Sequence, residues 1–335
     1  MPRILRLNNP LHAMITGTGC AVPGRVLTNQ DLEKMVDTSD EWIRERTGIA
    51  ERHIIEEGRY TSDLCAEAAQ RALAEAGVSA LDVDLISVAT VTGDMGFPST
   101  GCIVQEKIGA HNAAAFDIAA ACSGFLYGLS WAEAMIAAGK ARTVLVIGGE
   151  TLSRITDYQD RTTAVLFGDG AGAAVLQPSD GRRGILGSYL KSDGRFGRLL
   201  YLDGMGTQYP PTHESIDQRA GYIRMEGREV FKQAVTAMGD AAETVLQRAG
   251  LTGADVDLLI PHQANMRIID ATARRVKVPL ERVFVNVDRY GNTSAASIPI
   301  AIDEARRSGR LGPGKLALLV AFGSGLTWAS ALVRF

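Results

Sequence analysis

The chain contains an internal repeat, and this repeat constrains its fold more than any other sequence feature. The stretch AGVSALDVDLISVAT, residues 76–90, is echoed by AGLTGADVDLLIPHQ, residues 249–263. A second pair follows in the same order, because residues 122–149 and 295–325 share a succession of small residues, a helical period, a glycine, a basic residue and an apolar run. Two pairs in the same order indicate one ancestral unit used twice.

Each half alternates between helical and strand-like segments. In the first half the pattern predicts helices near residues 62–76, 100–108 and 123–138, and strands at residues 85–90, 115–118 and 143–147. Buried parallel strands flanked by helices are the natural arrangement. Two such halves are expected to pack as two sheets that share a central helical layer, which makes an α/β fold of layered αβαβα architecture.

We assign residues 1–177 to an N-terminal half and residues 178–335 to a C-terminal half. Residues 178–222 break the alternation with Gly, Pro, Asp and Arg and have only short β-like runs. We expect an insertion there, and such loops often shape a binding site. The length of 335 residues, beyond that of a usual single core, agrees with two fused halves.

Composition excludes several classes of protein. No apolar run approaches the about 20 residues of a membrane span, and the N-terminus MPRILRLNNPLHAMITGTG lacks the features of a secretory signal, so we expect a cytoplasmic protein without a membrane partner. The net charge of −3 argues against a generally basic nucleic-acid binder. Four cysteines without CxxC spacing argue against a disulfide framework and a zinc ribbon. No closely spaced set of His, Cys and carboxylates predicts a metal centre.

Two glycine-rich stretches resemble nucleotide-binding loops only in their letters. GDGAGA, residues 168–173, is followed by a short apolar run rather than a helix, and GTGCAVPG, residues 17–24, does not open a helix immediately. We interpret both stretches as tight turns, the first of them between two strands.

Cys122 lies where the apolar run AAFDIAAA meets the helical segment SGFLYGLSWAEAMIAAG. At a helix start, unpaired backbone N–H groups favour thiolate over thiol, which predicts a lowered pKa. Its small neighbours would let a substrate carbonyl approach the sulfur. The alternative is a small buried core residue, as most unpaired cysteines are.

Polar residues gather at three further places. His262, Gln263 and Asn265 follow the apolar run DLLI, at a strand end where α/β sheets usually display catalytic groups, although His262 would equally suit a cap or the core. Asn292 precedes the helix start that corresponds, in the repeat, to the segment with Cys122; an ordinary N-cap is the alternative. In AFGSGLTW, the N–H groups around Ser324 suit either carbonyl polarisation or a plain hairpin bend.

Motifs along nearly the whole chain resemble those of a known family. They are VDTSDEWIRERTGIAERHI, FDIAAACSGF, FGDGAGAAVL, IPHQANMRII, GNTSAAS and the C-terminal TWASALVRF. In this order they resemble β-ketoacyl-acyl carrier protein synthase III, the initiating condensing enzyme of bacterial fatty acid synthesis, which has the thiolase fold. The resemblance implies no cofactor, because the CoA thioester is a substrate.

The resemblance implies a ping-pong reaction. An acyl group, acetyl or another short one, would move from acyl-CoA to the sulfur of Cys122, with the N–H groups of Cys122 and Ser324 as the oxyanion hole. Malonyl-acyl carrier protein would then enter, and His262 and Asn292 would hydrogen-bond its thioester carbonyl. As carbon dioxide leaves, these donors would stabilise the enolate, which attacks the acyl group to give β-ketoacyl-acyl carrier protein.

Matching positions also imply binding residues. Trp42 and Arg161 would sandwich the CoA adenine, while Thr38 and Arg46 would contact the nucleotide end; a surface-clamped Trp and a salt-bridged Arg are the alternatives. The family often has glycine at the position of Ser324, and a serine narrows the permitted backbone angles.

Two aromatic residues are assigned by the same resemblance. Phe97 would reach into the acyl pocket of the partner across a homodimer interface. Phe322 would form a wall of the active site. Without the resemblance, both would be interpreted as plain core aromatics.

The carrier protein is acidic, so a basic helix is a candidate docking surface. The segment NMRIIDATARRVKV contains Arg267, Arg274, Arg275 and Lys277 against Asp270, and Lys232 would join them; a solvated helix face is the alternative. A related acyltransferase or condensing enzyme of secondary metabolism with the same Cys-His-Asn triad is the competing function, and a non-catalytic partner of such an enzyme is a further class.

Overall fold

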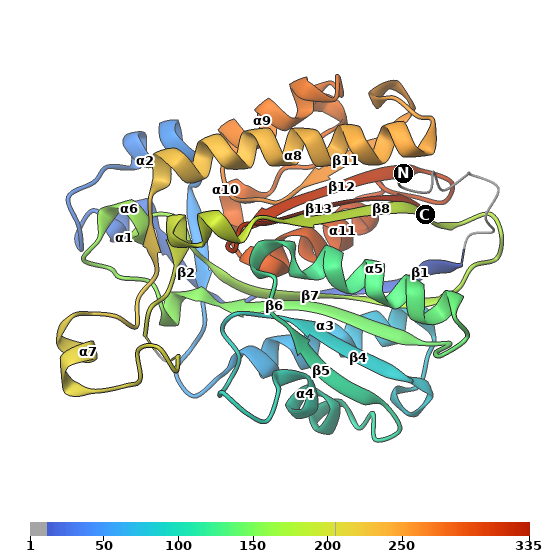
Figure 1. Cartoon of the computed structure of the whole chain (residues 1–335), viewed down its shortest axis with the longest axis horizontal. Helices are drawn as coiled ribbons and strands as arrows, with labels where there is room; N and C mark the ends of the chain where they lie inside the picture. Colours follow the sequence, from blue (N-terminus) through green and yellow to red (C-terminus); the bar gives the residue numbers. More distant parts are fainter. Residues whose placement is uncertain (1–11, 205) are drawn as a thin grey trace.

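The computed structural model describes residues 12–204 and 206–335. The N-terminal stretch, which we expected to be no secretory signal, lies largely outside the described residues. Two sheets form the frame (Figure 1). The first has the order β1-β7-β6-β4-β5, with β1 (Ala13–Ala21), β4 (Leu85–Ala89), β5 (Ala114–Ile118), β6 (Val144–Thr151) and β7 (Asp169–Pro178). The second has the order β11-β12-β13-β8, with β8 (Gly184–Ser192), β11 (Leu258–Pro261), β12 (Leu316–Gly323) and β13 (Thr327–Arg334).

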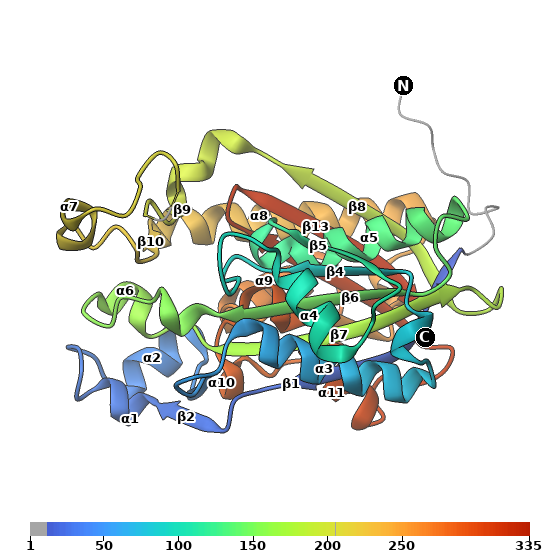
Figure 2. The ribbon, with the colours of Figure 1, turned by 90° about the horizontal axis from the view of Figure 1, so that it is seen from below.

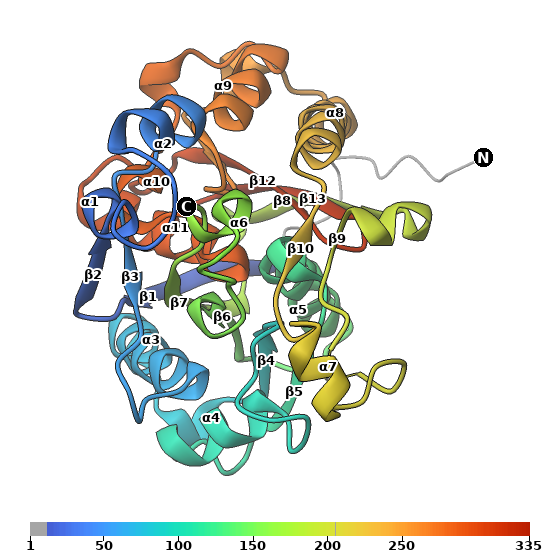
Figure 3. The ribbon, with the colours of Figure 1, turned by 90° about the vertical axis from the view of Figure 1, so that its left-hand side faces the viewer.

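The helices complete five layers, which the end-on view of Figure 3 separates clearly. The central layer contains α5 (Gly124–Ala137) and α11 (Ser297–Arg307), whose apolar side chains pack with those of both sheets in one core cluster. The outer layers contain α3 (Thr61–Ala76) and α4 (Thr100–Ile108) on the first sheet, seen from below in Figure 2, and α8 (Gly227–Ala249) and α9 (Met266–Arg275) on the second. The predicted αβαβα architecture is confirmed.

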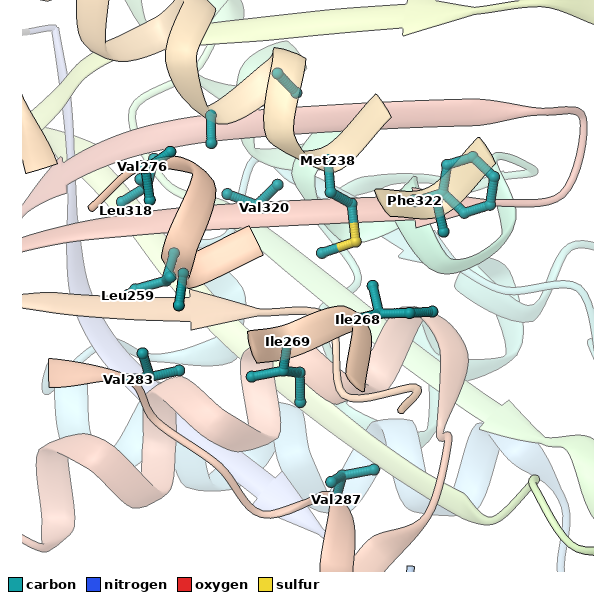
Figure 4. Close-up of a cluster of buried hydrophobic side chains, with 14 of the residues drawn as sticks. Met238, Leu259, Ile268, Ile269, Val276, Val283, Val287, Leu318, Val320 and Phe322 are labelled. Carbon is teal, nitrogen blue, oxygen red and sulfur yellow. The ribbon is translucent and has the colours of Figure 1, made fainter. Parts of the chain in front are cut away.

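Figure 4 shows the core between the second sheet and its outer helices. Met238 from α8 and Ile268 and Ile269 from α9 meet Val320 and Phe322 of β12, all at most 8% exposed. Burial of each such large apolar side chain stabilises the fold by about 1.5–3 kcal/mol. This packing fixes the end of β12 close to the start of α9.

The first sheet is mixed. Strand β4 runs parallel to β5 and β6, whereas β7 pairs antiparallel with β6 and β1. The second sheet repeats this plan, because β11 is parallel to β12 while β12, β13 and β8 are antiparallel. The fifth strand is reduced there to a single parallel bridge between Leu259 and Val283.

The repeat is visible in the way each half turns from helix to strand. Helix α3 ends at Gly77 and α8 ends at Gly250, with φ values of 66° and 68° that glycine adopts at little cost. A 3₁₀ turn then leads into β4 in one half, η1 (Ala80–Asp82), and into β11 in the other, η5 (Gly253–Asp255).

The prediction that both glycine-rich stretches are turns is wrong, because most of their residues lie in strands. Residues 169–173 of GDGAGA lie inside β7, and residues 17–21 of GTGCAVPG lie inside β1. Their glycines let helices approach, since a Cβ at Gly172 would lie 2.7 Å from the nitrogen of Ile300, and one at Gly17 would lie 2.3 Å from the oxygen of Ala72. Only residues 22–24 form a bend between strands.

The segment that we expected to be an insertion begins with β8, which belongs to the second sheet. Pairing with β13 recruits β8 although its sequence has only a weak strand pattern. The remainder projects from one end of the molecule (Figure 2) and contains η4 (Gly194–Leu199), β9 (Leu200–Tyr201) and α7 (His213–Asp217). Strand β10 (Arg224–Met225), which pairs with β9, lies just beyond the predicted segment.

Short elements complete the end of the molecule beside α2. They are β2 (Arg25–Thr28), α1 (Asn29–Leu32), α2 (Asp40–Thr47), β3 (Glu51–Ile54), α6 (Arg161–Ala164) and α10 (Val287–Tyr290), together with the 3₁₀ turn η3 (Leu152–Arg154). A further 3₁₀ turn, η6 (Leu280–Arg282), contacts η5 through a hydrogen bond from Arg282 to Ala254. Within residues 12–204 and 206–335, no helix has the length and apolar character needed to span a bilayer.

Candidate active site

Cys122, His262 and Asn292 line one cavity of about 540 Å³, together with Phe322 and Gly323. Each comes from a different part of the fold. Cys122 belongs to the 3₁₀ turn η2 (Ala121–Ser123) before α5, His262 follows β11, and Asn292 precedes the turn η7 (Ser294–Ala296) before α11. The fold therefore brings together the three side chains that we selected from the sequence.

The sulfur of Cys122 lies in a buried site. The residue is 9% exposed, and burial raises the pKa of its thiol to about 12, although the hydroxyl of Ser294 acts in the opposite direction. The predicted lowering of this pKa is therefore wrong for the free protein. The reason is that loss of water around the sulfur outweighs the favourable position at a helix start.

His262 is held as a neutral ring. Its Nδ1 lies 2.6 Å from the hydroxyl of Ser297 on α11, and burial lowers the pKa of the imidazole to about 3. When the serine donates to Nδ1, the ring proton resides on Nε2. His262 then offers an N–H donor from a ring that carries no charge.

Asn292 is oriented by its own backbone neighbours. Its side-chain oxygen accepts the N–H of Ser294 at 2.9 Å, and its backbone is fixed by bonds to Leu166 and Gly168. With the oxygen engaged, the amide NH₂ is the group left for a ligand. The residue is 8% exposed.

Backbone donors lie next to the sulfur. Gly323, at the end of β12, approaches so closely that a Cβ there would lie 2.7 Å from the nitrogen of Cys122. Throughout the described parts of the chain, neither the N–H of Cys122 nor that of Ser324 has a hydrogen-bond acceptor. Two unused N–H groups beside a nucleophile have the character of an oxyanion hole.

Ser324 fits its position without a strained backbone angle, since it is not among the non-glycine residues with positive φ. Its hydroxyl donates to the carbonyl of Leu200 in β9, and the bend joins β12 to β13 as a hairpin. The side chain thus attaches the hairpin to the projecting segment.

Two of the residues selected for nucleotide binding, Trp42 and Arg46, line the main cavity. The guanidinium of Arg161 lies 4.9 Å from the centre of the Trp42 ring, and that of Arg46 lies 5.9 Å from it. Arg161 also pairs with Asp37 at 3.5 Å, and the buried hydroxyl of Thr38 has no partner within the described residues. The four predicted residues are therefore neighbours.

A second cavity of about 250 Å³ lies on the other side of the sulfur. Most of its lining is apolar, and Cys122, Ser294 and Ser324 supply its polar edge. Phe322 is 5% exposed and lines the main cavity. Phe97, by contrast, is 88% exposed on the loop between β4 and α4 and is far from being a core aromatic.

The basic residues near α9 differ in their availability. Arg267 lines the cavity and lies over the ring of Phe231 at 5.1 Å. Arg274 and Lys232 are exposed, and each pairs with an acidic neighbour on its own helix. Arg275 is instead bound to Asp240 and Glu243 of α8.

The two polar residues next to His262 have structural roles. The amide of Gln263 donates to Pro261 and Phe284 and accepts two backbone N–H groups. Asn265 caps α9 and donates to the carbonyl of Arg46. Among the described residues, no group of three or more His, Cys, Asp or Glu side chains is arranged to hold a metal ion.

Sequence reasoning missed three polar residues that contact the candidate site. Ser297 contacts His262, and Ser294 connects the surroundings of Cys122 to Glu150, which is fully buried at the end of β6. The sequence carried one usable signal for Glu150, because a carboxylate directly after a buried apolar strand requires compensation.

Comparison with known proteins agrees with this geometry. Residues 116–194 match the family 3-Oxoacyl-[acyl-carrier-protein (ACP)] synthase III, and residues 246–335 match its C-terminal region. The chain is 55% identical over 323 residues to beta-ketoacyl-[acyl-carrier-protein] synthase III of Caldanaerobacter subterraneus subsp. tengcongensis, covering 96% of this chain and 98% of that protein. The synthase III of Roseiflexus castenholzii gives the same identity and coverage.

A solved structure shows the same fold. The crystal structure of 3-oxoacyl-[acyl-carrier-protein] synthase III from Aquifex aeolicus VF5 superimposes with a TM-score of 0.90 at 49% identity, covering 96% of this chain and all of that one. With the fold, the sequence matches and the convergent cavity in agreement, the chain belongs to the 3-oxoacyl-[acyl-carrier-protein] synthase III family.

Proposed function

We propose that Cys122, His262 and Asn292 carry out the reaction of this family, an acyl transfer followed by a decarboxylating condensation that initiates fatty acid synthesis. The observation that carries the assignment is their convergence on one cavity from three separate elements. An acyl-CoA primer is the first substrate and malonyl-acyl carrier protein the second. The product is a β-ketoacyl-acyl carrier protein.

In the first half-reaction, the sulfur of Cys122 attacks the thioester carbonyl of the primer. The carbonyl oxygen becomes negatively charged and is stabilised by the N–H groups of Cys122 and Ser324, which have no other acceptor among the described residues. The carbon–sulfur bond to CoA then breaks. CoA leaves, and the acyl group remains on Cys122.

In the second half-reaction, the thioester carbonyl of malonyl-acyl carrier protein accepts hydrogen bonds from Nε2 of His262 and from the amide of Asn292. Loss of carbon dioxide places negative charge on this oxygen, so the two donors bind the enolate more strongly than the ground state. A neutral imidazole suits this role, because the proton on Nε2 stays available as a donor. The enolate carbon attacks the acyl group and releases the sulfur of Cys122.

The mouth of the cavity supports binding of the nucleotide end of CoA. A purine ring between Trp42 and Arg161 would stack on both, and Arg46 and Thr38 are adjacent. The reaction requires no further cofactor or metal, since the thioester supplies the activated acyl group.

Arg267 lines the cavity, and the exposed cations Lys232 and Arg274 lie on the adjacent helices α8 and α9, which supports docking of an acidic carrier protein there. The exposed Phe97 and strand β5 at the edge of the first sheet support a homodimer in which each Phe97 closes the smaller cavity of its partner. Such a cavity suits short acyl groups. We place the reaction in the cytoplasm.

Radiolabelled acetyl-CoA tests the assignment of the nucleophile. The wild-type protein should acquire label on Cys122, and malonyl-acyl carrier protein should discharge it as a β-ketoacyl product with release of carbon dioxide. Label that persists in Cys122→Ala would refute the assignment. Transfer of label without carbon dioxide release would favour the related acyltransferase of secondary metabolism, and a panel of acyl-CoA primers defines the chain length accepted.

A further inference from the structure

Glu150 is a fully buried carboxyl group without a positive partner. It ends β6 and accepts hydrogen bonds from the backbone N–H of Val91 at 3.1 Å, from the hydroxyls of Thr90 and Thr92, and from that of Ser294 at 3.0 Å. Within the described parts of the chain it forms no salt bridge. A buried charge without a cation is costly, so its retention beside the candidate site requires an explanation.

Ser294 lies between this carboxyl group and the nucleophile. Its hydroxyl donates to Glu150, and Ser294 and Cys122 border the same small cavity, where this hydroxyl lowers the pKa of the Cys122 thiol against the effect of burial. One hydroxyl proton cannot be donated to both groups at once. When the proton points to Glu150, the oxygen is free to accept the S–H of Cys122; when it points to the sulfur, it stabilises a thiolate.

The other titratable groups are placed differently. Cys65, from α3, approaches the backbone of Gly149 from the opposite side of β6, and burial raises the pKa of its thiol. His262 is engaged with Ser297 on α11. Ser294 is hydrogen-bonded to Glu150 and borders the small cavity that Cys122 also lines.

We propose that Ser294 and Glu150 form a proton relay for Cys122, in which Glu150 holds the thiol proton while the cysteine carries the acyl group. This inference rests on the proposed role of Cys122 as nucleophile. On acylation the S–H bond breaks, its proton binds the oxygen of Ser294, and the original hydroxyl proton of Ser294 moves to Glu150. The departing CoA thiolate takes a proton from water.

The relay runs in reverse at the end of the cycle. Attack of the enolate carbon on the acyl group breaks the carbon–sulfur bond and leaves Cys122 as a thiolate. Glu150 then returns its proton through Ser294, and the carboxylate and the thiol are restored. Over one turnover the enzyme is unchanged, and the one proton consumed is the one that CoA takes from water.

The pKa values of Glu150 and Cys122, the two ends of the relay, agree with this arrangement. Burial raises the pKa of Glu150 to about 7, so the carboxyl group is able to hold a proton near neutral pH, while the thiol at about 12 does not ionise there unaided. The carboxylate form is the one that accepts the proton. Acylation through the relay should therefore become faster as pH rises through about 7 and then level off.

Alkylation of Cys122 by iodoacetamide tests the relay without any thioester or carrier protein. The rate of modification of the Cys122 peptide is measured by mass spectrometry between about pH 5.5 and 9, with the exposed Cys102 as internal reference. In the wild-type protein the Cys122 rate should rise to a plateau with a midpoint near the pKa of Glu150. In Glu150→Gln the rate near neutral pH should fall at least about tenfold, and it should keep rising about tenfold per pH unit without a plateau.

Ser294→Ala should give the same loss of the plateau. It tests the relay independently if Glu150→Gln does not fold. Alanine is suited to the left-handed backbone of Ser294, with φ 48°, because Ala121 adopts φ 46° in the corresponding turn. Ser123→Ala is the matched control: its hydroxyl lies next to Cys122 in the chain but donates to Thr327, so the plateau should remain. Glu150→Asp should retain the plateau at a lower rate.

A folded Glu150→Gln protein with the wild-type plateau and midpoint would overturn the relay and leave Glu150 a purely structural group. The relay would also be overturned if Glu150→Gln changed the alkylation rate of Cys122 by the same factor at every pH. Failure of the proposed function gives a different result. The alkylation rate of Cys122 would then still show the plateau, but acetyl-CoA would not label Cys122.

Discussion

The two halves of the molecule build the same local frame and use it for different chemistry. Each has a 3₁₀ turn before a central helix, η2 before α5 and η7 before α11, and each turn begins with a non-glycine residue in the left-handed region. The turn of the first half contains the sulfur of Cys122. At the matching place in the second half stands Ala295, and the polar groups Asn292 and Ser294 stand before it.

Corresponding contacts between strand end and helix start show the same division. In the first half, Gly124 packs against the methyl group of Ala89, where a Cβ would lie only 2.8 Å away. In the repeat alignment these positions become Ser297 and His262, which share a hydrogen bond. The difference teaches that the first half keeps small residues beside the sulfur of Cys122, while the second half has polar, hydrogen-bonding side chains at the equivalent positions.

The largest expected effect separates the two half-reactions along this division. His262→Ala or Asn292→Ala should slow malonyl decarboxylation by about 10²- to 10³-fold, because each removes a donor to the enolate oxygen. Acylation of Cys122 should change much less. Single-turnover measurements of label uptake and carbon dioxide release check this, and a larger loss in acylation than in decarboxylation would contradict the division.

An intermediate effect is expected when the hydroxyl beside His262 is removed, because the first half has no hydroxyl at the corresponding position, Gly124. Ser297→Ala removes the hydroxyl that orients His262, and a lost hydrogen bond of about 0.5–1.5 kcal/mol corresponds to a drop of about two- to tenfold in decarboxylation rate. Ser308→Ala, near the end of the same helix, removes a hydroxyl that contacts Ala305 far from the cavity and is the control. Equal rates for both variants would show that the ring needs no orienting partner.

The smallest effect concerns stability. His262 titrates near pH 6.5 when unfolded but near 3 when folded, so the unfolded chain binds the additional proton between these values. Stability should therefore fall as pH drops through this window, by at most about 1.4 kcal/mol per pH unit from this group. Urea unfolding at several pH values should show a weaker dependence in His262→Gln, whereas an unchanged slope would mean that the ring gains its proton in the folded state.

The sequence predicted the regular parts of the fold well. Helix α4 has the predicted bounds, α3 begins one residue earlier than predicted, and α5 is one residue shorter at each end. The amphipathic period determines these helices locally. The convergence of Cys122, His262 and Asn292 on one cavity was also predictable, since they lie at repeat-related strand ends and helix starts.

Features that depend on distant partners were not predictable from local pattern. Strand β8 forms because β13 pairs with it, and Gly172 lies inside a strand because α11 approaches it closely. The pKa of Cys122 depends on how completely the second half covers the sulfur, which no local pattern records. The same applies to Glu150, whose neighbour Ser294 is 144 residues away in the chain.

The contact between Arg161 and Trp42 has a consequence for which thioesters enter. The two side chains already stack on each other, so a ligand must separate them to pass between. A purine replaces the lost stacking on both faces, whereas a carrier-protein arm without an aromatic ring replaces neither. Under the proposed function, the pair would therefore favour the nucleotide-bearing donor on this path, whereas entry of the carrier protein would depend on the basic residues near α9.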